Sequence, residues 1–325
     1  MIRFAVIGTG WIAEEFVKGA QLVPGLEFAA VYSRSADRGK TFAEPFGGAS
    51  VYTNIYDLAK SDVDAVYIAS PNSLHYEQSK LMLQSGKHVL CEKPVCVEPE
   101  EYSELCELAH KKDLIYSEAI MYLHLPEREA LSSALKDIGN ITSAHFDFSQ
   151  LSSKYPALKR GELPNIFNSK FATGCLMDLG IYCVYPALDL FGEPNEIFAH
   201  SKFLQTGADG SGTAVFNYDG MQVTLTYSKT GQDRCGSQIL GDEGTIVIPS
   251  ISRLYNMKKI GNDDGEKIIS GFKEKHICMS YEAESFYKWI IKKNCRVDYE
   301  KSCEAILNAN KTLQKIRKKA GIIFG

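Results

Sequence analysis

Short apolar segments alternate with helical patterns over roughly the first 118 residues of the chain. Apolar or β-branched runs predict strands at Ile2–Ile7, near Val51, and at Glu27–Tyr32, Ala65–Ala69, His88–Cys91 and Leu114–Ser117. Helical periodicity is clearest at Leu74–Gln84, which Gly86 ends, and at Glu100–Lys111, which follows Pro99. This alternation is typical of right-handed βαβ units, so we predict an α/β fold with a doubly wound parallel sheet.

After about Tyr122 the pattern changes to longer alternating runs joined by turn dipeptides. Strands are predicted at Thr142–Gln150, Gly212–Tyr218, Gln222–Ser228, Ser237–Leu240 and Thr245–Ile248. Asp219-Gly220 and Asp264-Gly265 favour antiparallel hairpins. Helical patterns cover Leu176–Phe191, Tyr281–Lys292 and Tyr299–Lys318. We therefore predict a parallel-sheet domain over residues 1–120 and an α+β domain with a large, mainly antiparallel open sheet over residues 121–325.

The composition narrows the range of partners. The 325 residues include 36 basic and 40 acidic side chains, with a formal net charge of -4, so we expect neither nucleic acid nor an anionic membrane as a partner. No stretch approaches a transmembrane span, and we expect no leader segment. The 9 cysteines form no C-x-x-C pair, which is typical of reduced thiols in a cytoplasmic protein. A small-molecule partner is expected.

A glycine loop follows the first predicted strand. Gly8-Thr9-Gly10-Trp11-Ile12-Ala13 has the pattern G-x-G-x-x-A at the start of a helix. Gly8 permits a tight turn, Gly10 lets the backbone approach a pyrophosphate, and the small Ala13 lets helix and strand pack closely. Packing alone can also produce such a loop, but its place at the head of a βαβ series favours dinucleotide binding by a Rossmann-type domain.

No acid stands at the end of the second strand, where a ribose-binding carboxylate is expected. The sequence there is Tyr32-Ser33-Arg34-Ser35. Arg34, with Ser33 and Arg38, can hold a 2′-phosphate through charge-assisted hydrogen bonds, which predicts NADP as cofactor with NAD as an alternative. A solvated loop arginine is the other interpretation. The missing acid also argues against a methyltransferase built on the same glycine loop.

Three further motifs carry a family resemblance. Ser70-Pro71-Asn72-Ser73-Leu74-His75 and Cys91-Glu92-Lys93-Pro94 follow parallel strands, at the sheet edge where ligands bind. In Thr173–Tyr182, a turn opens a helix that has Asp178 and Tyr182 at i and i+4 on one face. With the glycine loop, these motifs resemble the Gfo/Idh/MocA family of glucose-fructose oxidoreductase and inositol dehydrogenase over essentially the full length. Tyr182, in place of His, resembles the branch that contains glucose-fructose oxidoreductase and dimeric dihydrodiol dehydrogenase.

The resemblance implies an NAD(P)-dependent dehydrogenase or reductase. Its reaction would move a hydride between a nicotinamide and a hydroxyl or carbonyl group of a sugar, cyclitol or dihydrodiol. An unperturbed Tyr or Lys is a poor base at neutral pH, but a nearby ammonium stabilises a phenolate. We therefore predict Tyr182 as the proton-transfer residue and Lys93 as its electrostatic partner and substrate-hydroxyl donor. Asp178 is predicted to orient the substrate or Lys93.

The resemblance also predicts the surroundings of these residues. The cofactor is expected to meet Ser70, Pro71, Asn72, His75, Glu92 and Lys93, although a local hydrogen bond is an equal explanation for His75. The Lys93–Pro94 bond is typically cis in the family. Polar groups of Tyr155–Lys170 would hold the substrate, and no metal site is expected. The open sheet leaves one face that needs cover, which predicts a homodimer.

Two departures from the family pattern keep a second hypothesis open. The chain has Ala172-Thr173-Gly174 where the family commonly has three glycines, and Tyr185 where many members have Asp or Asn. A dinucleotide-binding regulator that has lost turnover would also fit these changes. The presence of both Lys93 and Tyr182 argues against it.

Overall fold

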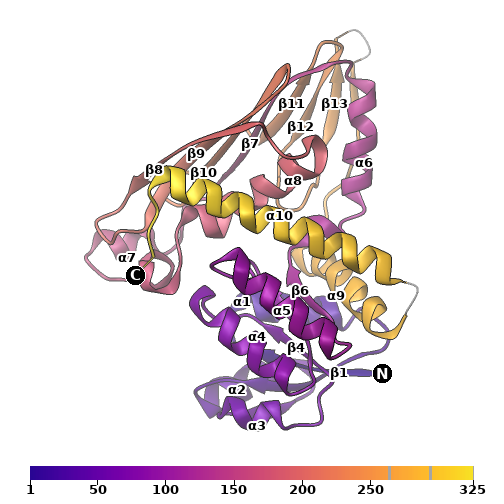
Figure 1. Cartoon of the computed structure of the whole chain (residues 1–325), viewed down its shortest axis with the longest axis vertical. Helices are drawn as coiled ribbons and strands as arrows, with labels where there is room; N and C mark the ends of the chain where they lie inside the picture. The colour runs from indigo at the N-terminus through magenta and orange to yellow at the C-terminus, as the bar shows by residue number, and fades with distance from the viewer. Residues whose placement is uncertain (263–264, 293–294, 325) are drawn as a thin grey trace. The chain divides into compact units, whose positions relative to one another are not determined.

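A computed structural model describes residues 1–262, 265–292 and 295–324, which form two compact units (Figure 1). The parallel-sheet unit comprises Met1–His124 and Glu274–Leu307, and the mixed-sheet unit comprises Leu125–Lys273 and Asn308–Gly325. The second predicted domain ran unbroken from residue 121 to the C-terminus. The structure instead places part of that segment with the parallel-sheet unit, because helix α9 (Lys275–Ile291) lies against helix α1 (Trp11–Ala20).

The parallel-sheet unit has six strands in the order β3-β2-β1-β4-β5-β6, and every neighbouring pair is parallel. The strands are β1 (Ile2–Ile7), β2 (Leu26–Tyr32), β3 (Ser50–Tyr52), β4 (Ala65–Ile68), β5 (His88–Glu92) and β6 (Tyr116–Ala119). This confirms the doubly wound sheet. The last strand begins two residues later than predicted, because the buried Leu114 and Ile115 add apolar character before it. The order reverses at β1, so the expected ligand edge lies beyond β1 and β4.

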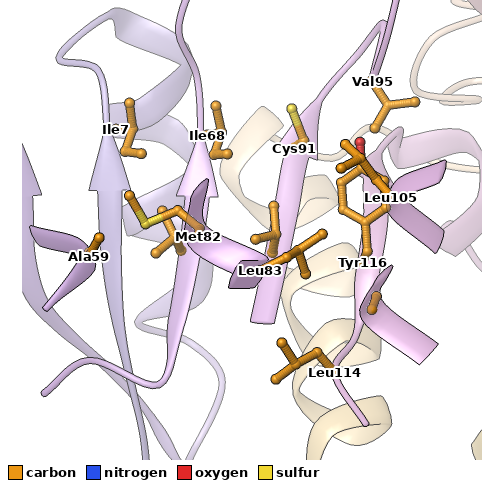
Figure 2. Packing of buried hydrophobic residues seen from close by; sticks show 14 of the residues in the cluster. Ile7, Ala59, Ile68, Met82, Leu83, Cys91, Val95, Leu105, Leu114 and Tyr116 are labelled. Atoms are coloured by element: carbon orange, nitrogen blue, oxygen red, sulfur yellow. The ribbon is translucent and has the colours of Figure 1, made fainter. Parts of the chain in front are cut away.

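The core of this unit lies between the sheet and its helices. Besides α1 and α9, these are α2 (Ala36–Ala43), α3 (Ile55–Ala59), α4 (His75–Gln84) and α5 (Pro99–Lys111). In Figure 2, Ile68 and Cys91 from the strands pack with Met82 and Leu83 from α4 and with Leu105 from α5, and all are fully buried. Strands covered on both faces become continuous apolar runs, which is why their positions were predictable.

The mixed-sheet unit has eight strands in the order β14-β13-β12-β11-β7-β10-β9-β8, with β7 and β10 as its one parallel pair. The strands are β7 (Ile141–Ser149), β8 (Glu196–Phe203), β9 (Asp209–Tyr218), β10 (Met221–Ser228), β11 (Ser237–Gly241), β12 (Gly244–Ile248), β13 (Lys258–Gly261) and β14 (Glu266–Ile268). The mainly antiparallel open sheet is confirmed. Its strands β8, β13 and β14 were not predicted, because they lie toward the sheet edges and bury few side chains.

The predicted turns fall between neighbouring strands of this sheet. Asp219-Gly220 joins β9 and β10, which pair antiparallel as expected. The other predicted turn lies between β13 and β14, which also pair antiparallel, but its Asp264 is outside the described residues.

Helix α8 (Ile181–Phe191) packs on one face of the mixed sheet, where Val223 and Leu225 of β10 are fully buried. The remaining helices are α6 (Glu127–Ala134), α7 (Tyr155–Lys159) and α10 (Arg296–Ala320), and the short 3-10 helices are η1 (Glu44–Phe46), η2 (Asn72–Leu74), η3 (Met121–His124), η4 (Leu135–Asp137), η5 (Asn165–Phe167) and η6 (Ser169–Phe171).

One described stretch, Ser169–Phe191, has the length and composition of a membrane span, which was not expected. Its most apolar window is 78% buried, as in the core helix of a soluble protein.

Candidate active site

The glycine loop has the geometry that its sequence predicts. Gly8 has a φ of +111°, and a Cβ atom there would lie 2.6 Å from the carbonyl oxygen of Ala69, so only glycine fits this close approach to the end of β4. Gly10 has an ordinary φ of -83° and precedes the first turn of α1. A Cβ atom at Gly10 would meet no atom within 4 Å. The backbone of Gly10 therefore borders open space at a helix N-terminus, which is suited to a pyrophosphate.

Trp11 and Ile12 open helix α1 directly after the loop. The Trp11 side chain is 65% exposed, and the Lys275 ammonium of α9 lies 4.5 Å from the centroid of its ring. This cation–π contact brings a basic group from a distant part of the sequence beside the predicted phosphate site.

A pocket of about 540 Å³ lies at the ribose end of the predicted site. Its lining combines Thr9 of the glycine loop and Arg38 of α2 with Glu14, Asp37, Thr41, Phe42, Pro45 and Phe46. Arg34 is exposed at the end of β2, outside the residues that line this pocket. The Ser33 hydroxyl is buried and accepts a hydrogen bond from the backbone N–H of Ser35, at 3.3 Å. Ser33 thus shapes the loop that presents Arg34.

The loops after β4 and β5 are fastened to each other. The Lys93–Pro94 peptide bond is cis, as the family resemblance implied. The buried His75 ring lies 2.8 Å from the carbonyl oxygen of Pro94 through Nδ1 and 2.8 Å from that of Ser70 through Nε2. Both ring nitrogens face protein carbonyls. His75 therefore connects the two loops, which favours the local hydrogen-bonding explanation over direct contact with the cofactor.

Pro71 and Asn72 continue the loop after β4 into the short helix η2, and Asn72 is buried. After β5, the backbone N–H of Val95 donates a 2.6 Å hydrogen bond to the Glu118 carboxylate on β6. This hydrogen bond fixes the backbone two residues after Lys93.

Besides Glu118, two further buried carboxyl groups lie close to this loop, and only Glu92 was predicted to have a role. Glu92 accepts hydrogen bonds from the Tyr67 hydroxyl and from the backbone N–H of Lys93. Glu282 of α9 is 1% exposed, and neither of its carboxyl oxygens has a hydrogen-bond partner among the described residues. Burial raises the pKa of both, and the charge of Glu92 raises the pKa of Glu282 further. Sequence patterns missed Glu282 because nothing in α9 indicates its distant neighbour.

The residues of the motif Thr173–Tyr182 lie together in the mixed-sheet unit. Leu176–Gly180 forms a π-helical turn that continues into α8, where the sequence predicted one regular helix from Leu176. Asp178 lies on this turn with its side chain 25% exposed. Tyr182 follows on α8, and its ring packs edge-on against Phe148 of β7 at a centroid distance of 5.3 Å. A π-turn of this kind is often found at functional sites.

Asp178 forms an ion pair with Lys229, a residue that the sequence did not point to. Lys229 follows β10 and its side chain is only 4% exposed. Its ammonium also lies 3.4 Å from the carbonyl oxygen of Ile166 and 5.8 Å from the ring centroid of Phe167. The predicted pairing of Asp178 was with the substrate or Lys93. The structure adds a cationic partner within its own unit, and the pairing with the substrate or Lys93 stays a prediction.

Asp209 explains why Gly174 is kept in the altered glycine turn. Its carboxylate accepts a 2.7 Å hydrogen bond from the backbone N–H of Leu176 and a 3.1 Å contact from the Cys175 thiol, and burial raises its pKa. A Cβ atom on Gly174 would lie 1.8 Å from an Asp209 carboxylate oxygen. Gly174 is therefore required by this close contact, whereas Ala172 adopts the left-handed region without being glycine. Tyr185, the other departure, is buried in the core.

The segment predicted to hold the substrate borders a pocket of about 600 Å³ in the mixed-sheet unit. Its lining comprises residues of α7 and the following loop together with the end of β8: Tyr155, Leu158, Lys159, Gly161, Glu162, Leu163, Phe203, Leu204, Gln205 and Thr206. Among the described residues, no group of three or more His, Cys, Asp or Glu side chains is arranged to hold a metal ion.

Comparison with known proteins places these motifs in a family. Residues 2–120 match the model of the Gfo/Idh/MocA oxidoreductase family with an NAD-binding Rossmann fold, and residues 133–247 match the model of its C-terminal domain. The scyllo-inositol 2-dehydrogenase (NADP(+)) IolU of Bacillus subtilis is 38% identical over 100% of this chain and 98% of its own length. The chain belongs to the Gfo/Idh/MocA family.

Other family members extend the comparison. The human trans-1,2-dihydrobenzene-1,2-diol dehydrogenase is 30% identical over 76% of this chain and 74% of its own. The 3-ketoreductase KijD10 from Actinomadura kijaniata, solved with NADP and TDP-benzene, has the same fold, with a TM-score of 0.84 at 23% identity over 98% of this chain and 97% of its own. This Gfo/Idh/MocA protein is an NAD(P)-dependent oxidoreductase that acts on CH–OH groups.

Proposed function

We propose that this enzyme catalyses the NADP-dependent, reversible oxidation of a secondary or anomeric hydroxyl group of a cyclitol, sugar or dihydrodiol. The observation that carries the proposal is the full-length similarity to an NADP-dependent scyllo-inositol 2-dehydrogenase. The presence of Lys93 before a cis proline and of Asp178 and Tyr182 on one helical segment supports it. The same residues argue against a regulator without turnover.

The proposed roles follow from the chemistry of alcohol oxidation. A nicotinamide held by the cofactor residues would supply the hydride acceptor for the alcohol carbon, so a protein group must take the hydroxyl proton as the carbonyl forms. Tyr182 takes this proton in the oxidation and returns it in the reduction. Lys93 donates a hydrogen bond to the substrate oxygen and stabilises the phenolate of Tyr182 by its charge. Asp178 accepts a hydrogen bond from a second substrate hydroxyl and so orients the substrate.

The proposed cofactor preference depends on the ribose end. Ser33 and Arg34 occupy the position of a ribose-binding carboxylate, and Arg38 and Thr9 line the adjacent pocket. The guanidinium groups of Arg34 and Arg38 are exposed and suited to a 2′-phosphate. The remaining predicted cofactor residues lie in the glycine loop, in α1, and at or just beyond the ends of β4 and β5: Gly8, Gly10, Trp11, Ile12, Ser70, Pro71, Asn72, Glu92 and Lys93.

A substrate screen tests the proposed function. The purified enzyme is assayed with NADP and with NAD, by nicotinamide fluorescence, against inositol isomers, aldoses and a trans-dihydrodiol. We expect NADP-dependent turnover with at least one of these classes, and turnover in the reverse direction with the matching ketone and NADPH. Tight NADPH binding without turnover on any of them would favour the regulator instead.

We also propose that the enzyme is a cytoplasmic homodimer. All nine cysteines, each within the described part of the chain, are free thiols, which suits a reducing compartment. The face of the mixed sheet opposite α8 carries half-buried side chains such as Val215, Thr224 and Thr226, and Phe198 of β8 is 54% exposed. A second copy could cover this face. Sedimentation at micromolar concentration should give a dimer, and a monomer would refute this.

A further inference from the structure

We propose that Lys229 is a positioning residue of the active site, which holds Asp178 in its charged form and fixes the direction of its carboxylate toward the substrate. The proposal rests on the proposed function through the role of Asp178. It concerns a residue that does not itself meet the substrate, because only 4% of the Lys229 side chain is exposed.

In the ion pair, Lys229 is the more buried residue and Asp178 the more exposed one. Lys229 is enclosed by the carbonyl oxygen of Ile166 and the ring of Phe167, both on η5, while its backbone N–H donates a 2.8 Å hydrogen bond to the carbonyl oxygen of Gly210. Asp178 keeps a quarter of its side chain exposed. Lys229 is therefore the buried member of the pair, and Asp178 is the member that keeps contact with solvent.

Burial makes this contact more than a surface ion pair. An exposed lysine and carboxylate are screened by water and contribute little. A buried ammonium keeps its charge only when a counter-ion and acceptors surround it, and Asp178 and the Ile166 carbonyl meet that need. Conversely, Lys229 offsets the cost that partial burial imposes on the Asp178 charge. Each residue thus fixes the orientation of the other.

The other titratable groups around the pair do not replace Lys229. Cys175 and Tyr182 lie on the same helical segment, Asp209 begins β9, and Tyr227 lies on β10. Burial raises the pKa of Cys175 and Tyr227, which keeps both neutral. Burial also raises the pKa of Asp209, which accepts hydrogen bonds from Leu176 and Cys175. Lys229 is a buried cation in direct contact with Asp178.

The test compares Lys229→Met, which removes the charge, with Lys229→Arg, which keeps it. Lys258→Met is the matched control, because Lys258 pairs with Glu266 in the same sheet at a largely exposed site, 2.8 Å apart. The pH profile of kcat/KM is measured for each enzyme on a substrate found in the screen. A carboxylate that loses its cation takes up a proton at a higher pH, and the substrate needs its charged form.

We expect Lys229→Met to lower kcat/KM at pH 7 by about tenfold or more and to move the acid limb of the profile to higher pH. Part of the loss should be recovered at pH 9. In Lys229→Arg the acid limb should stay at the pH found for the unmodified enzyme. Lys258→Met should have the same kcat/KM profile as the unmodified enzyme. If the limb stays in place in Lys229→Met, Lys229 is only a packing residue and the proposal is wrong.

A second measurement needs no substrate and therefore separates this proposal from the proposed function. Thermal unfolding is followed at pH 5 and pH 8 for the unmodified protein, for Lys229→Met, for Asp178→Asn and for the double variant. Without Lys229, a charged Asp178 is costly in the folded state, so the loss of Tm in Lys229→Met should be larger at pH 8 than at pH 5. Adding Asp178→Asn should remove this difference. A loss that is equal at both pH values would overturn the proposal, even if turnover is never found.

Discussion

The two glycines of the phosphate loop should respond to the same substitution in opposite ways. At Gly8 an alanine meets two obstacles, a φ of +111° and the Ala69 carbonyl oxygen 2.6 Å from the new Cβ atom. Because that oxygen belongs to the backbone, it cannot rotate away. At Gly10 the same methyl group meets no protein atom within 4 Å. Gly8→Ala should therefore damage the fold, and Gly10→Ala should damage the ligand site alone.

The expected losses of stability and of NADPH affinity follow from these contacts. Backbone strain at Gly8 costs about 1–3 kcal/mol, and the clash with Ala69 adds to it, so we expect a loss of about 3 kcal/mol in the free energy of unfolding. For a chain of 325 residues, with an unfolding entropy of about 2.1 cal/mol/K per residue, that corresponds to about 4–5 °C in Tm. Gly10→Ala should cost at most about 1 kcal/mol, through the weaker preference for alanine at a helix N-cap. Its methyl group should weaken NADPH binding about tenfold or more, the equivalent of about 1.4 kcal/mol.

The assay pairs thermal unfolding of the cofactor-free protein with a fluorescence titration of NADPH. Gly47→Ala is the control for strain alone, since Gly47 has a φ of +87° and open space around its Cβ position. The difference in stability between Gly8→Ala and Gly47→Ala then reports the contact with Ala69. Unchanged NADPH affinity in Gly10→Ala would refute the assignment of this loop to the pyrophosphate, and an unchanged Tm in Gly8→Ala would refute the steric reasoning.

Three further outcomes are expected. NADP should bind more tightly than NAD, and Arg34→Ala should remove most of this preference, about tenfold or more, because a charge-assisted phosphate contact is lost; equal affinities in the unmodified enzyme, measured by titration, would contradict this. Lys93→Met and Tyr182→Phe should each lower turnover by about two orders of magnitude with little change in cofactor affinity, and the double variant should lose scarcely more than the worse single one; additive losses would mean independent roles. Burial raises the pKa of Glu282 well above 4.5, so the folded protein loses stability as pH rises from about that value toward the raised pKa. Glu282→Gln should consequently raise Tm by a few degrees at pH 8 and little at pH 5, and the opposite ordering in thermal melts would exclude a protonated Glu282.

Local patterns in the sequence determined the parallel-sheet unit and the motif positions. Strands buried on both faces are mostly apolar, so Ile2–Ile7 and His88–Cys91 were visible as nearly continuous apolar runs. The glycine loop was equally visible, because its G-x-G-x-x-A spacing lies within one strand–turn–helix segment, although the Ala69 carbonyl oxygen that excludes a side chain at Gly8 comes from the end of β4. The Lys93 and Asp178 motifs were found by family resemblance, which identifies residues but not their neighbours. Edge strands such as β8 were not predicted, because half-exposed segments show no regular alternation of apolar and polar residues.

Only the tertiary structure decided which groups support the motif residues. Lys229 lies 51 residues from Asp178 and Asp209 lies 33 residues from Leu176, and a lysine after a strand looks in sequence like any solvated one. Glu282 is brought to the parallel-sheet unit because α9 packs on α1, where a Cβ atom at Gly19 would lie 2.6 Å from the His276 carbonyl oxygen. The periodicity of apolar residues in a segment indicates which of its faces is buried and which is exposed. The charge and burial of a side chain depend on segments that are distant in the sequence, and those contacts exist only once the chain has folded.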